Sequence, residues 1–440
     1  MVDEPYIQSV SRLTDAIRKD RRELLNLISV LNDRVARYDF KLKSFVRVNP
    51  QLLQDSEKTD PRSLLTGLPI AVKDLIDTHE IATTYGSRTF EQHFPSKDAE
   101  VVENIKRNGG IIQGKTNTHE FALGISTPPT VNPWDLTRIP GGSSGGSASA
   151  ISAGLSIVAL GTDTGGSIRI PSAMCGITGL KPTYGRFSMD GIFPESFAED
   201  HVGPMCRYAS DLRIILNSMS SQDQGVNCKR VPPLKIGLIN EFFSQSDIEV
   251  ARLALKALEK MESEGAVCEL RDFALPNLDI IKESHDIIDK TEIFHVHTQL
   301  YPESRTHSKS DVIEEMEAGR KLKAADYVSA LRFKVRAKKE FSEALRGIDV
   351  IASPTLPRVA PTILESERFT LSDHGIYTKF LTPFNYLGTP SITVPCGFSA
   401  GLPVGLQLVA DTWKDDTVVA LASSYQEVTA WHTKICDMFV

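Results

Sequence analysis

The sequence predicts an α/β protein built on a large, mostly parallel or mixed β-sheet, and three observations support this. Short apolar runs bounded by Gly or Pro, typical of buried strands, recur along the chain, as in 67–74 and 391–395. Segments with helical apolar spacing, such as 247–264, lie between these runs. With 41% hydrophobic and 24% charged residues, the composition is that of an ordinary globular protein with a sizeable core.

The expected elements follow from apolar spacing and from Gly and Pro as stop signals. The expected strands cover residues 67–74, 111–112, 234–238, 268–270, 349–354, 391–395 and 405–409. The expected helices cover residues of about 10–38, 98–108, 247–264, 276–299, 311–346 and 415–430. Gly and Ser crowd into two stretches, 141–150 and 161–167, on either side of an apolar segment. A flexible linker of that composition would not be embedded in strand- and helix-like sequence.

Charge and cysteine usage exclude several classes of protein. A net charge of -7 and a pI of about 5.9 argue against direct nucleic-acid binding. The six cysteines are scattered without a C-x-x-C pair, which argues against a zinc or disulfide framework and fits a reducing cytosol. Residues 1–5 lack the basic start of a signal peptide, and no apolar run is long enough to span a membrane. We therefore expect a cytoplasmic protein with no membrane contact, no metal and no cofactor.

Residues 109–116, Gly-Gly-Ile-Ile-Gln-Gly-Lys-Thr, match the phosphate-binding string G-x-x-x-x-G-K-[ST]. That motif needs a strand before the first Gly and a helix after the Lys, so that backbone N–H groups can surround a phosphate. Here a helix precedes the string, and Ile111 and Ile112 occupy the position of the loop. We interpret the segment as a helix–turn–strand junction rather than a nucleotide site.

The Gly/Ser stretch also matches G-x-S-x-G, centred on Ser143 or Ser144. The nucleophile elbow of α/β-hydrolases directly follows a buried strand, whereas residues 132–140 form a polar stretch with two prolines. His374 and His432 lie in no recognisable triad context, and we expect surface or structural roles for both. An α/β-hydrolase triad is therefore rejected.

A stronger chemical signal combines Lys73, which ends an apolar strand, with the serines of the two Gly/Ser stretches. Gly165 and Gly166, directly before Ser167, allow a close backbone approach, and successive N–H groups there can converge on an oxyanion. Taken alone, a lysine at a strand end is usually a solvated surface charge. The serine segments argue against that alternative here.

These segments resemble the amidase signature family. The matching stretches are 67–74, 114–117, 132–135, 140–147, 161–169, 171–173, 175–176, 179–186 and 403–407. The resemblance runs from about residue 20 to the C-terminal helix and is weakest in 225–345. It implies a large twisted mixed sheet sandwiched between layers of α-helices, with an N-terminal helical segment, 1–60, packed on a catalytic domain, 61–440. Residues 225–345 are then a less diagnostic helical elaboration of that domain.

The resemblance also assigns catalytic roles. It implies that Ser167 is the nucleophile, that Ser143 is the bridging serine held by a cis peptide, and that Lys73 is the base. It implies an oxyanion hole built from the backbone N–H groups of Thr164, Gly165, Gly166 and Ser167. We interpret Asp163 and Arg169, which flank the nucleophile, as charges that hold the loop.

This arrangement makes chemical sense. A serine hydroxyl is a poor nucleophile until a neighbour accepts its proton, which Ser143 would pass on to Lys73. Lys73 must then be neutral, so its pKa must fall from about 10.4 to about 7. Burial of an ammonium group lowers a lysine pKa by that much, and the apolar residues 70–72 fit such a site.

The expected activity is hydrolysis of a small-molecule linear amide through an acyl-enzyme, by a free-standing amidase; a homodimer is compatible with this. Aromatic residues such as Phe197, Tyr377, Phe380 and Phe384 are expected to pack in the core rather than to line an acyl pocket. One alternative is the glutaminase A subunit of a tRNA-dependent amidotransferase. Against it, the Pro-Ala-Glu-x-x-Ser-Asn-Leu segment of that subunit is replaced by residues 291–297, and its Ser-x-Asp by residues 197–201. An alternative of another class is a catalytically inactive scaffold on the same fold, although all three catalytic positions carry the needed residue types.

Overall fold

The structure is a computed structural model that describes residues 4–221 and 232–440. Residues 1–3 of the N-terminal stretch and Cys228 lie outside the described residues. The other five cysteines, Cys175, Cys206, Cys268, Cys396 and Cys436, form no disulfide, in agreement with the expectation from their scattered spacing. Among the described residues, none of the helices combines the length and the apolar character needed to span a bilayer.

Eleven strands of the described chain form one mixed sheet, in the order β1-β3-β2-β4-β6-β5-β10-β11-β9-β7-β8. The strands are β1 (Phe45–Val48), β2 (Pro69–Lys73), β3 (Ile111–Thr116), β4 (Val158–Thr162), β5 (Thr178–Lys181), β6 (Val202–Cys206), β7 (Leu234–Leu238), β8 (Val267–Asp272), β9 (Val350–Pro354), β10 (Ser391–Ser399) and β11 (Leu402–Val409). β2 runs parallel to both β3 and β4, and β7 runs parallel to β8 and β9. Antiparallel pairs join these parallel groups in the middle of the sheet.

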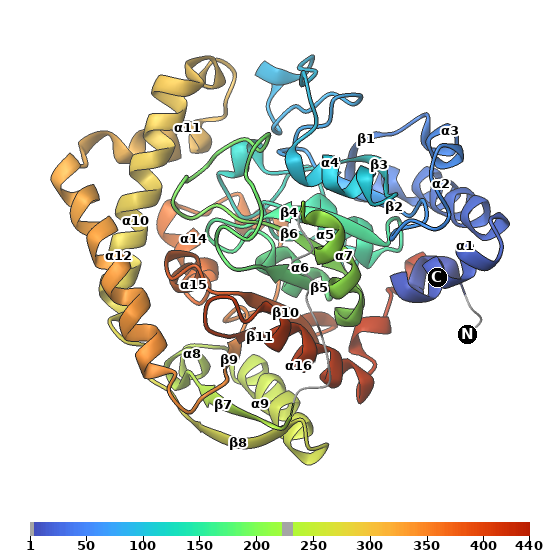
Figure 1. Cartoon of the computed structure of the whole chain (residues 1–440). Coiled ribbons are helices and arrows are strands. Elements are labelled where there is room, and N and C mark those ends of the chain that lie inside the picture. Colours follow the sequence, from blue (N-terminus) through green and yellow to red (C-terminus); the bar gives the residue numbers. More distant parts are fainter. Residues whose placement is uncertain (1–3, 222–231) are drawn as a thin grey trace.

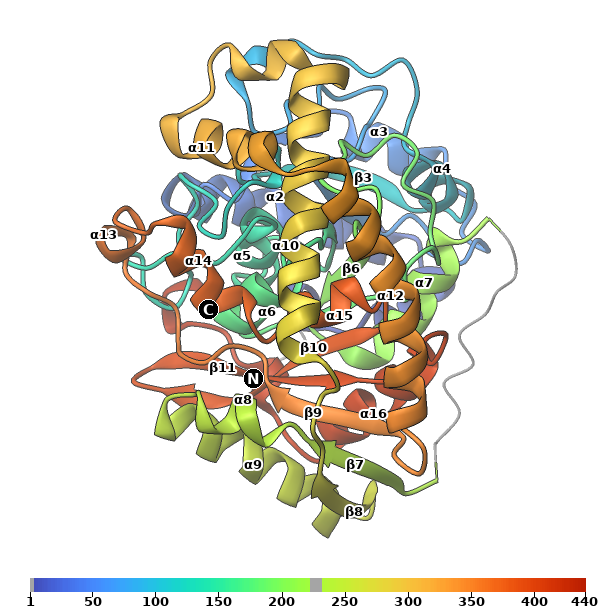
Figure 2. The same ribbon diagram turned by 90° about the vertical axis from the view of Figure 1, so that its left-hand side faces the viewer.

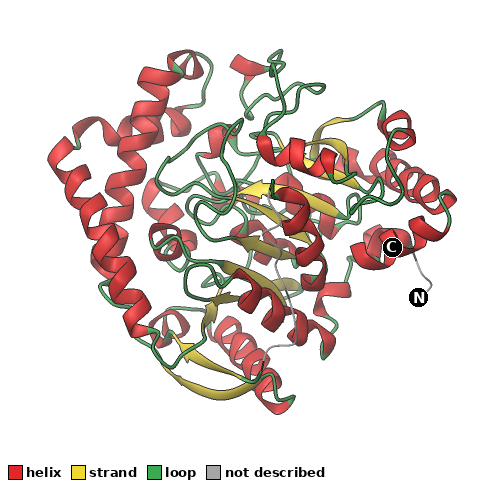
Figure 3. Ribbon diagram, viewed as in Figure 1, coloured by secondary structure: helices red, strands yellow, loops and turns green. Residues whose placement is uncertain are grey.

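Helices surround this sheet (Figure 1, Figure 3). They are α1 (Val10–Lys19), α2 (Arg22–Leu42), α3 (Leu52–Glu57), α4 (Glu100–Arg107), α5 (Gly145–Ser152), α6 (Arg169–Cys175), α7 (Leu212–Met219), α8 (Asn240–Ser244), α9 (Ile248–Ser263), α10 (Leu278–His295), α11 (Ser310–Ala318), α12 (Ala324–Ala344), α13 (Ile363–Ser366), α14 (Leu371–Thr378), α15 (Thr382–Tyr386) and α16 (Asp415–Glu427). All seven segments expected to be strands coincide with or overlap strands, whereas β1, β4, β5 and β6 were not predicted.

The alternation of side chains along β2 shows how the sheet is covered on both faces. Ile70 and Val72 belong to the large core cluster on one face, where α4, α7, α9 and α16 contribute residues. Ala71, between them, packs on the opposite face in a cluster with Ala148 of α5 and Cys175 of α6. The sheet thus lies between helical layers, which confirms the predicted fold class.

One expected helix, 311–346, is divided in the structure into α11 and α12. The break comes at Gly319, where the chain crosses α10. A Cβ atom at this position would lie 2.0 Å from the carbonyl oxygen of Lys290, so only glycine fits so close to α10. The α10–α12 pair then runs side by side in front of the central strands (Figure 2).

Candidate active site

Lys73 lies at the carboxyl end of β2, and its position follows from the strand pairing. β2 and β4 are parallel, with Val72 opposite Leu160, so their carboxyl ends meet at one edge. Lys73 Nζ lies 2.7 Å from Thr162 Oγ1 at the end of β4 and 2.7 Å from Ser143 Oγ. All three side chains lie in the interior, and Lys73 has no exposed surface.

The pKa of Lys73 is lowered by burial. The loss of solvent lowers the pKa of its ammonium group to about 7, while the charges of Glu195, Asp163 and Asp200 act in the opposite direction. Among the described residues, no carboxylate lies within ion-pair distance of Nζ, and its neighbours are hydroxyl groups. Near neutral pH, a substantial fraction of Lys73 is therefore uncharged and able to accept a proton.

Ser143 lies in a tightly held loop directly before α5. The Gly142–Ser143 peptide bond is cis, as the family resemblance implies. The Ser143 carbonyl accepts hydrogen bonds from the His119 N–H at 3.1 Å and from Thr127 Oγ1 at 3.1 Å. Thr127 Oγ1 also accepts from the Gly145 N–H at 3.2 Å, so one threonine holds both sides of the loop.

Ser167 lies at the turn between β4 and α6. Its carbonyl accepts a hydrogen bond of 3.2 Å from the Ser144 N–H, which brings the two serine segments together. Gly166 makes the turn with a φ of +124°, and a Cβ atom there would lie 2.5 Å from Leu381 Cδ1. Within the described chain, no hydrogen bond joins the Ser143 and Ser167 hydroxyls. The structure thus pairs Lys73 with Ser143 and places Ser167 in the adjoining turn.

The backbone N–H groups of the 164–167 turn differ in their partners. The Gly166 N–H donates to Asp163 Oδ1 at 3.0 Å. For the N–H groups of Thr164, Gly165 and Ser167, no acceptor exists among the residues that the structure describes. Three unpaired donors beside a serine hydroxyl are what stabilisation of an oxyanion requires.

Asp163 and Arg169 stabilise this turn through buried hydrogen bonds and an ion pair. Arg169 forms a buried ion pair of 2.8 Å with Asp163, and also donates to Asn385 Oδ1 at 2.6 Å and to Gln407 Oε1 at 2.9 Å. Burial would raise the pKa of the Asp163 carboxyl, but the Arg169 guanidinium holds it well below its usual range. Asp163 therefore stays ionised and accepts the Ile168 N–H at 3.2 Å, in agreement with the expected loop-holding role.

Ser167 opens into a cavity of about 520 Å³. One wall is formed by the turn itself, with Gly165 and Ile170. The facing wall is one side of α10, whose residues at helical spacing, Lys282, His285, Asp286, Asp289, Lys290 and Ile293, all line the cavity. His374 of α14 also lines it and lies 3.4 Å from Glu315, and the expected surface or structural role for this histidine stays a prediction.

The aromatic side chains contribute little to this cavity. Tyr377, Phe380 and Phe384 are buried in the core, as expected. Phe197, by contrast, is 48% exposed on the surface. His432 is buried, and its carbonyl accepts a hydrogen bond from Arg207 at 3.2 Å, which fits a structural role.

Several residues of the site were not found by sequence reasoning. Thr162 ends β4 and contacts Lys73 because β2 pairs with β4 in parallel, a pairing that no local sequence pattern specifies. Thr127, Glu195 and Asp289 gave no local signal. They lie in loops or on a helix, and only the fold brings them to the site.

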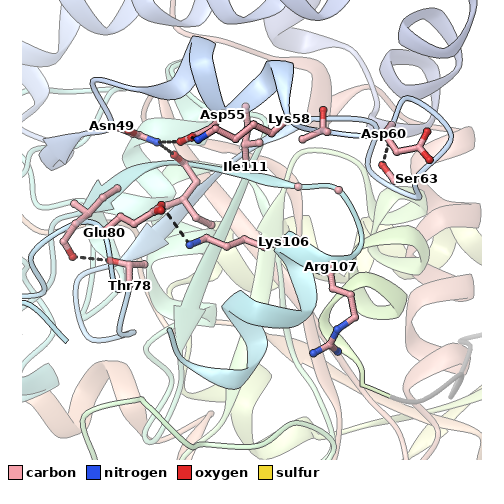
Figure 4. Close-up of a pocket in the computed structure, with 15 residues that line it drawn as sticks. Asn49, Asp55, Lys58, Asp60, Ser63, Thr78, Glu80, Lys106, Arg107 and Ile111 are labelled. Atoms are coloured by element: carbon pink, nitrogen blue, oxygen red, sulfur yellow. Dashed lines mark hydrogen bonds and ion pairs between the residues drawn. The ribbon is translucent and has the colours of Figure 1, made fainter. Parts of the chain in front are cut away.

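A second cavity, of about 390 Å³, lies beside the 109–112 segment of the phosphate-loop-like string (Figure 4). The N–H groups of Gly109, Gly110 and Ile111 donate to the carbonyls of Lys106, Ile105 and Leu68. Its lysines are also paired, Lys58 with Asp55 at 2.9 Å and Lys106 with Asp98 at 2.7 Å. With its backbone donors occupied, this junction cannot surround a phosphate, which supports the interpretation as a helix–turn–strand junction.

Comparison with known proteins agrees with this geometry. The family model described as Amidase matches residues 26–419. The chain is 31% identical to the A subunit of glutamyl-tRNA(Gln) amidotransferase from Sulfurihydrogenibium sp. (strain YO3AOP1), over 99% of this chain and 100% of that protein. It is 34% identical to the same protein from Chromohalobacter salexigens, over 97% of this chain and 98% of that protein.

Solved structures give the same result. One described as an amidase superposes with a TM-score of 0.86 at 28% identity, over 96% of this chain and 99% of that one. The A subunit of glutamyl-tRNA(Gln) amidotransferase from Thermotoga maritima superposes with a TM-score of 0.82 at 30% identity, over 97% of this chain and 96% of that one. The fold and these matches define a hydrolase of carboxamide C–N bonds. The chain belongs to the amidase family, the amidase signature enzymes.

Proposed function

We propose that this chain is a free-standing amidohydrolase that cleaves a linear amide through an acyl-enzyme on Ser167. The observation that carries this proposal is the 2.7 Å contact between Lys73 Nζ and Ser143 Oγ. A lysine that is buried, free of any ion pair among the described residues and lowered in pKa to about 7 is equipped to accept a proton. We call Lys73, Ser143 and Ser167 the relay.

In the proposed reaction, Ser167 Oγ attacks the amide carbonyl carbon. Its proton passes to the Ser143 hydroxyl, which gives its own proton to Lys73 Nζ. The N–H groups of Thr164, Gly165 and Ser167 stabilise the oxyanion, and Gly166 sets the turn that presents them. When the C–N bond breaks, the proton returns from Lys73 through Ser143 to the departing amine. Water then hydrolyses the ester through the same relay.

The scheme does not require a hydrogen bond between the Ser143 and Ser167 hydroxyls in the free enzyme, and among the described residues no such bond is formed. Hydrogen bonds between catalytic groups are often long or misaligned in a free enzyme and tighten in the substrate complex. The Ser144 N–H···O=C Ser167 contact already fixes the two backbones at 3.2 Å.

The preference for a free-standing enzyme rests on residues 291–297, which replace the Pro-Ala-Glu-x-x-Ser-Asn-Leu segment of the amidotransferase protein. Glu292, in this segment, accepts hydrogen bonds from the Ser196 hydroxyl at 2.5 Å and from Tyr327 Oη at 2.6 Å. It thus joins α10 to α12 and to the 195–200 loop. The segment has its own structural role here.

A second candidate function is the glutaminase component of a tRNA-dependent amidotransferase. The observation in its favour is the 31–34% identity to such proteins along nearly their whole length. The test is ammonia release by the purified chain alone from aliphatic, aryl and amino-acid amides. Release without ATP, tRNA or a second protein supports the free-standing enzyme. Release that needs glutamine and a co-purified partner would establish the amidotransferase component instead.

A further inference from the structure

Most charged groups that line the Ser167 cavity are paired. Asp286 lies 3.0 Å from Lys290, and Glu315 lies 3.4 Å from His374. His285 contacts Glu199, which lies behind the cavity wall.

Two carboxylates in the same cavity lack such partners. Glu195 Oε2 and Asp289 Oδ1 are shut off from solvent and have no hydrogen-bond partner among the described residues. Glu195 comes from the loop that follows Phe193, and Asp289 comes from α10. Each of these two elements therefore places in the same cavity one oxygen that lacks a hydrogen-bond partner. A buried acceptor without a partner costs free energy, and native structures contain few of them.

The pKa shifts of Glu195 and Asp289 indicate what kind of group would stabilise the two carboxylates. Burial raises the pKa of the Asp289 carboxyl well above its usual range, and the charge of Glu195 is the next cause. Burial, followed by the charge of Asp200, raises the pKa of Glu195 in the same way. A cation between the two carboxylates would remove both penalties at once.

An organic cation fits this pair better than a metal ion does. No group of three or more His, Cys, Asp or Glu side chains in the described parts of the chain is arranged to hold a metal ion. A primary ammonium group carries three N–H donors and can meet two carboxylates together. Lys282 and Lys379 also line the cavity, but among the described residues neither lysine satisfies the two unpartnered oxygens of Glu195 and Asp289.

The position of Glu195 determines where an ammonium group would bind relative to Ser167. After burial, the charge of Glu195 is the largest influence on the pKa of Lys73, so the carboxylate lies near the relay. Glu195 and Ser167 also line the same cavity, so an ammonium group bound by Glu195 can belong to the substrate whose amide reaches Ser167.

We propose that Glu195 and Asp289 bind a primary ammonium group of the substrate, so that the enzyme prefers amides carrying a positive charge a short spacer away from the reacting carbonyl. This inference rests on the proposed function, because it names the substrate class of the same site. It makes Glu195 and Asp289 determinants of specificity.

The first test compares matched substrates on the wild-type enzyme. β-Alaninamide, 4-aminobutanamide and 5-aminopentanamide are compared with butanamide, pentanamide and hexanamide, in which a methyl group replaces the ammonium. The half-amides of succinic, glutaric and adipic acid are the corresponding anionic substrates, in which a carboxylate replaces the ammonium. N-(2-aminoethyl)acetamide against N-propylacetamide tests a cation on the amine side. We expect kcat/KM for the cationic member of at least one series to exceed its neutral match by about 10–100-fold, the scale of hydrogen bonds to charged groups.

The second test removes the charges. Glu195→Gln and Asp289→Asn keep the shape of each side chain, and each should bring the cationic-to-neutral ratio of kcat/KM toward one. Asp286→Asn is the matched control, because Asp286 lines the same cavity from the same helix but is paired with Lys290; it should keep the ratio. Equal or greater activity on neutral or anionic amides by the wild type, or an unchanged ratio in both test variants, would overturn the inference.

A binding measurement tests the ammonium site independently of the proposed hydrolytic function. Calorimetric titration of Ser167→Ala with 4-aminobutanamide and N-(2-aminoethyl)acetamide, and with their neutral matches, requires no turnover. Tighter binding of a cationic member, lost in Ser167→Ala/Asp289→Asn, supports the ammonium site even if no amide is hydrolysed. Hydrolysis of neutral amides with no cationic preference in rate or binding would refute the ammonium site and leave the proposed function intact.

Discussion

Lys73 and His285 are both buried basic side chains beside the Ser167 cavity, and their surroundings shift their pKa values in opposite directions. Lys73 meets only hydroxyl groups, and burial lowers its pKa to about 7. Burial acts on His285 in the same sense, but the contact with Glu199 outweighs it and raises the pKa to about 9. The difference shows that a partner carboxylate, rather than burial alone, decides whether a buried base is charged.

The two residues also belong to different parts of the chain. Lys73 and the two serines come from the segments that resemble the amidase signature family. His285 lies on α10, within the less diagnostic region 225–345. The signature segments therefore carry the proposed base and nucleophile, and α10 supplies charged side chains that line the cavity. The following predictions test this division, from the largest expected effect to the smallest.

Ser167→Ala should abolish amide hydrolysis, ester hydrolysis and labelling by a fluorophosphonate probe. Loss of a catalytic serine nucleophile costs about 10⁶-fold in rate, which removes measurable activity. Mass spectrometry of the labelled wild type should place the adduct on Ser167. Ser152→Ala is the control, since the buried Ser152 hydroxyl donates to the Cys175 carbonyl at 2.7 Å, away from the relay. An adduct on any other residue would refute the assignment.

Lys73→Ala should lower amide hydrolysis by about 10²–10⁴-fold, the usual contribution of general base catalysis. The loss should be smaller for an activated aryl ester, because its leaving group departs without a proton. Ser143→Ala should behave similarly and still react with the fluorophosphonate, but more slowly. Parallel kcat/KM measurements on an amide and an ester check this. Equal losses on both substrates would mean that Lys73 does not protonate the leaving group, and no loss on either substrate would remove Lys73 from the proton path.

The His285–Glu199 contact should make stability depend on pH. The pKa of His285 is about 6.5 in an unfolded chain and about 9 in the folded one. Its contribution is therefore complete below pH 6.5 and is lost as the pH rises through 9, on the order of 3 kcal/mol in all. Thermal unfolding of wild type and His285→Gln between pH 6.5 and 9.5 should show the two melting temperatures converging. A constant difference would mean that His285 is neutral when folded.

Tyr327→Phe should have the smallest effect. It removes one donor to Glu292 and should lower the free energy of unfolding by about 1 kcal/mol. Because the contact ties α12 to α10 and does not touch the relay, the rate of fluorophosphonate labelling at Ser167 should stay the same. Denaturant unfolding and labelling kinetics measured side by side check both statements. A large loss of labelling would mean that the packing of α10 against α12 affects the reactivity of Ser167.

The sequence predicted seven of the eleven strands of the described sheet and the segments that carry the proposed relay, because these have local signals. Gly67–Asp74 shows a buried strand that ends in a charge, and the Gly-Gly-Ser string marks the turn at Ser167. The contact between Lys73 and Thr162 depends on the pairing of β2 with β4, which no local pattern specifies. The split of α11 from α12 likewise depends on how closely Gly319 passes α10.

The pocket-facing charges were beyond the reach of sequence reasoning for a similar reason. Asp286 and Asp289 both lie on one face of α10 and look alike in the sequence. Asp286 pairs with Lys290 one turn further along α10, a partner that helical spacing can predict, whereas only the packing of the cavity leaves an Asp289 oxygen without a partner. Spacing along a helix predicts a partner on the same helix, but not the surroundings that other elements supply.

The central claim is that neutral Lys73 drives the attack of Ser167 through Ser143. The most direct test is the pH dependence of kcat/KM on a neutral amide, for wild type and Lys73→Ala, since this quantity reports ionisations of the free enzyme. The account predicts a wild-type rate that rises with pH along a single ionisation at about pH 7, as the Lys73 ammonium loses its proton. That step should be absent from Lys73→Ala, whose rate should rise only toward high pH, where hydroxide replaces the missing base. An unchanged profile with a modest loss of rate would contradict the account.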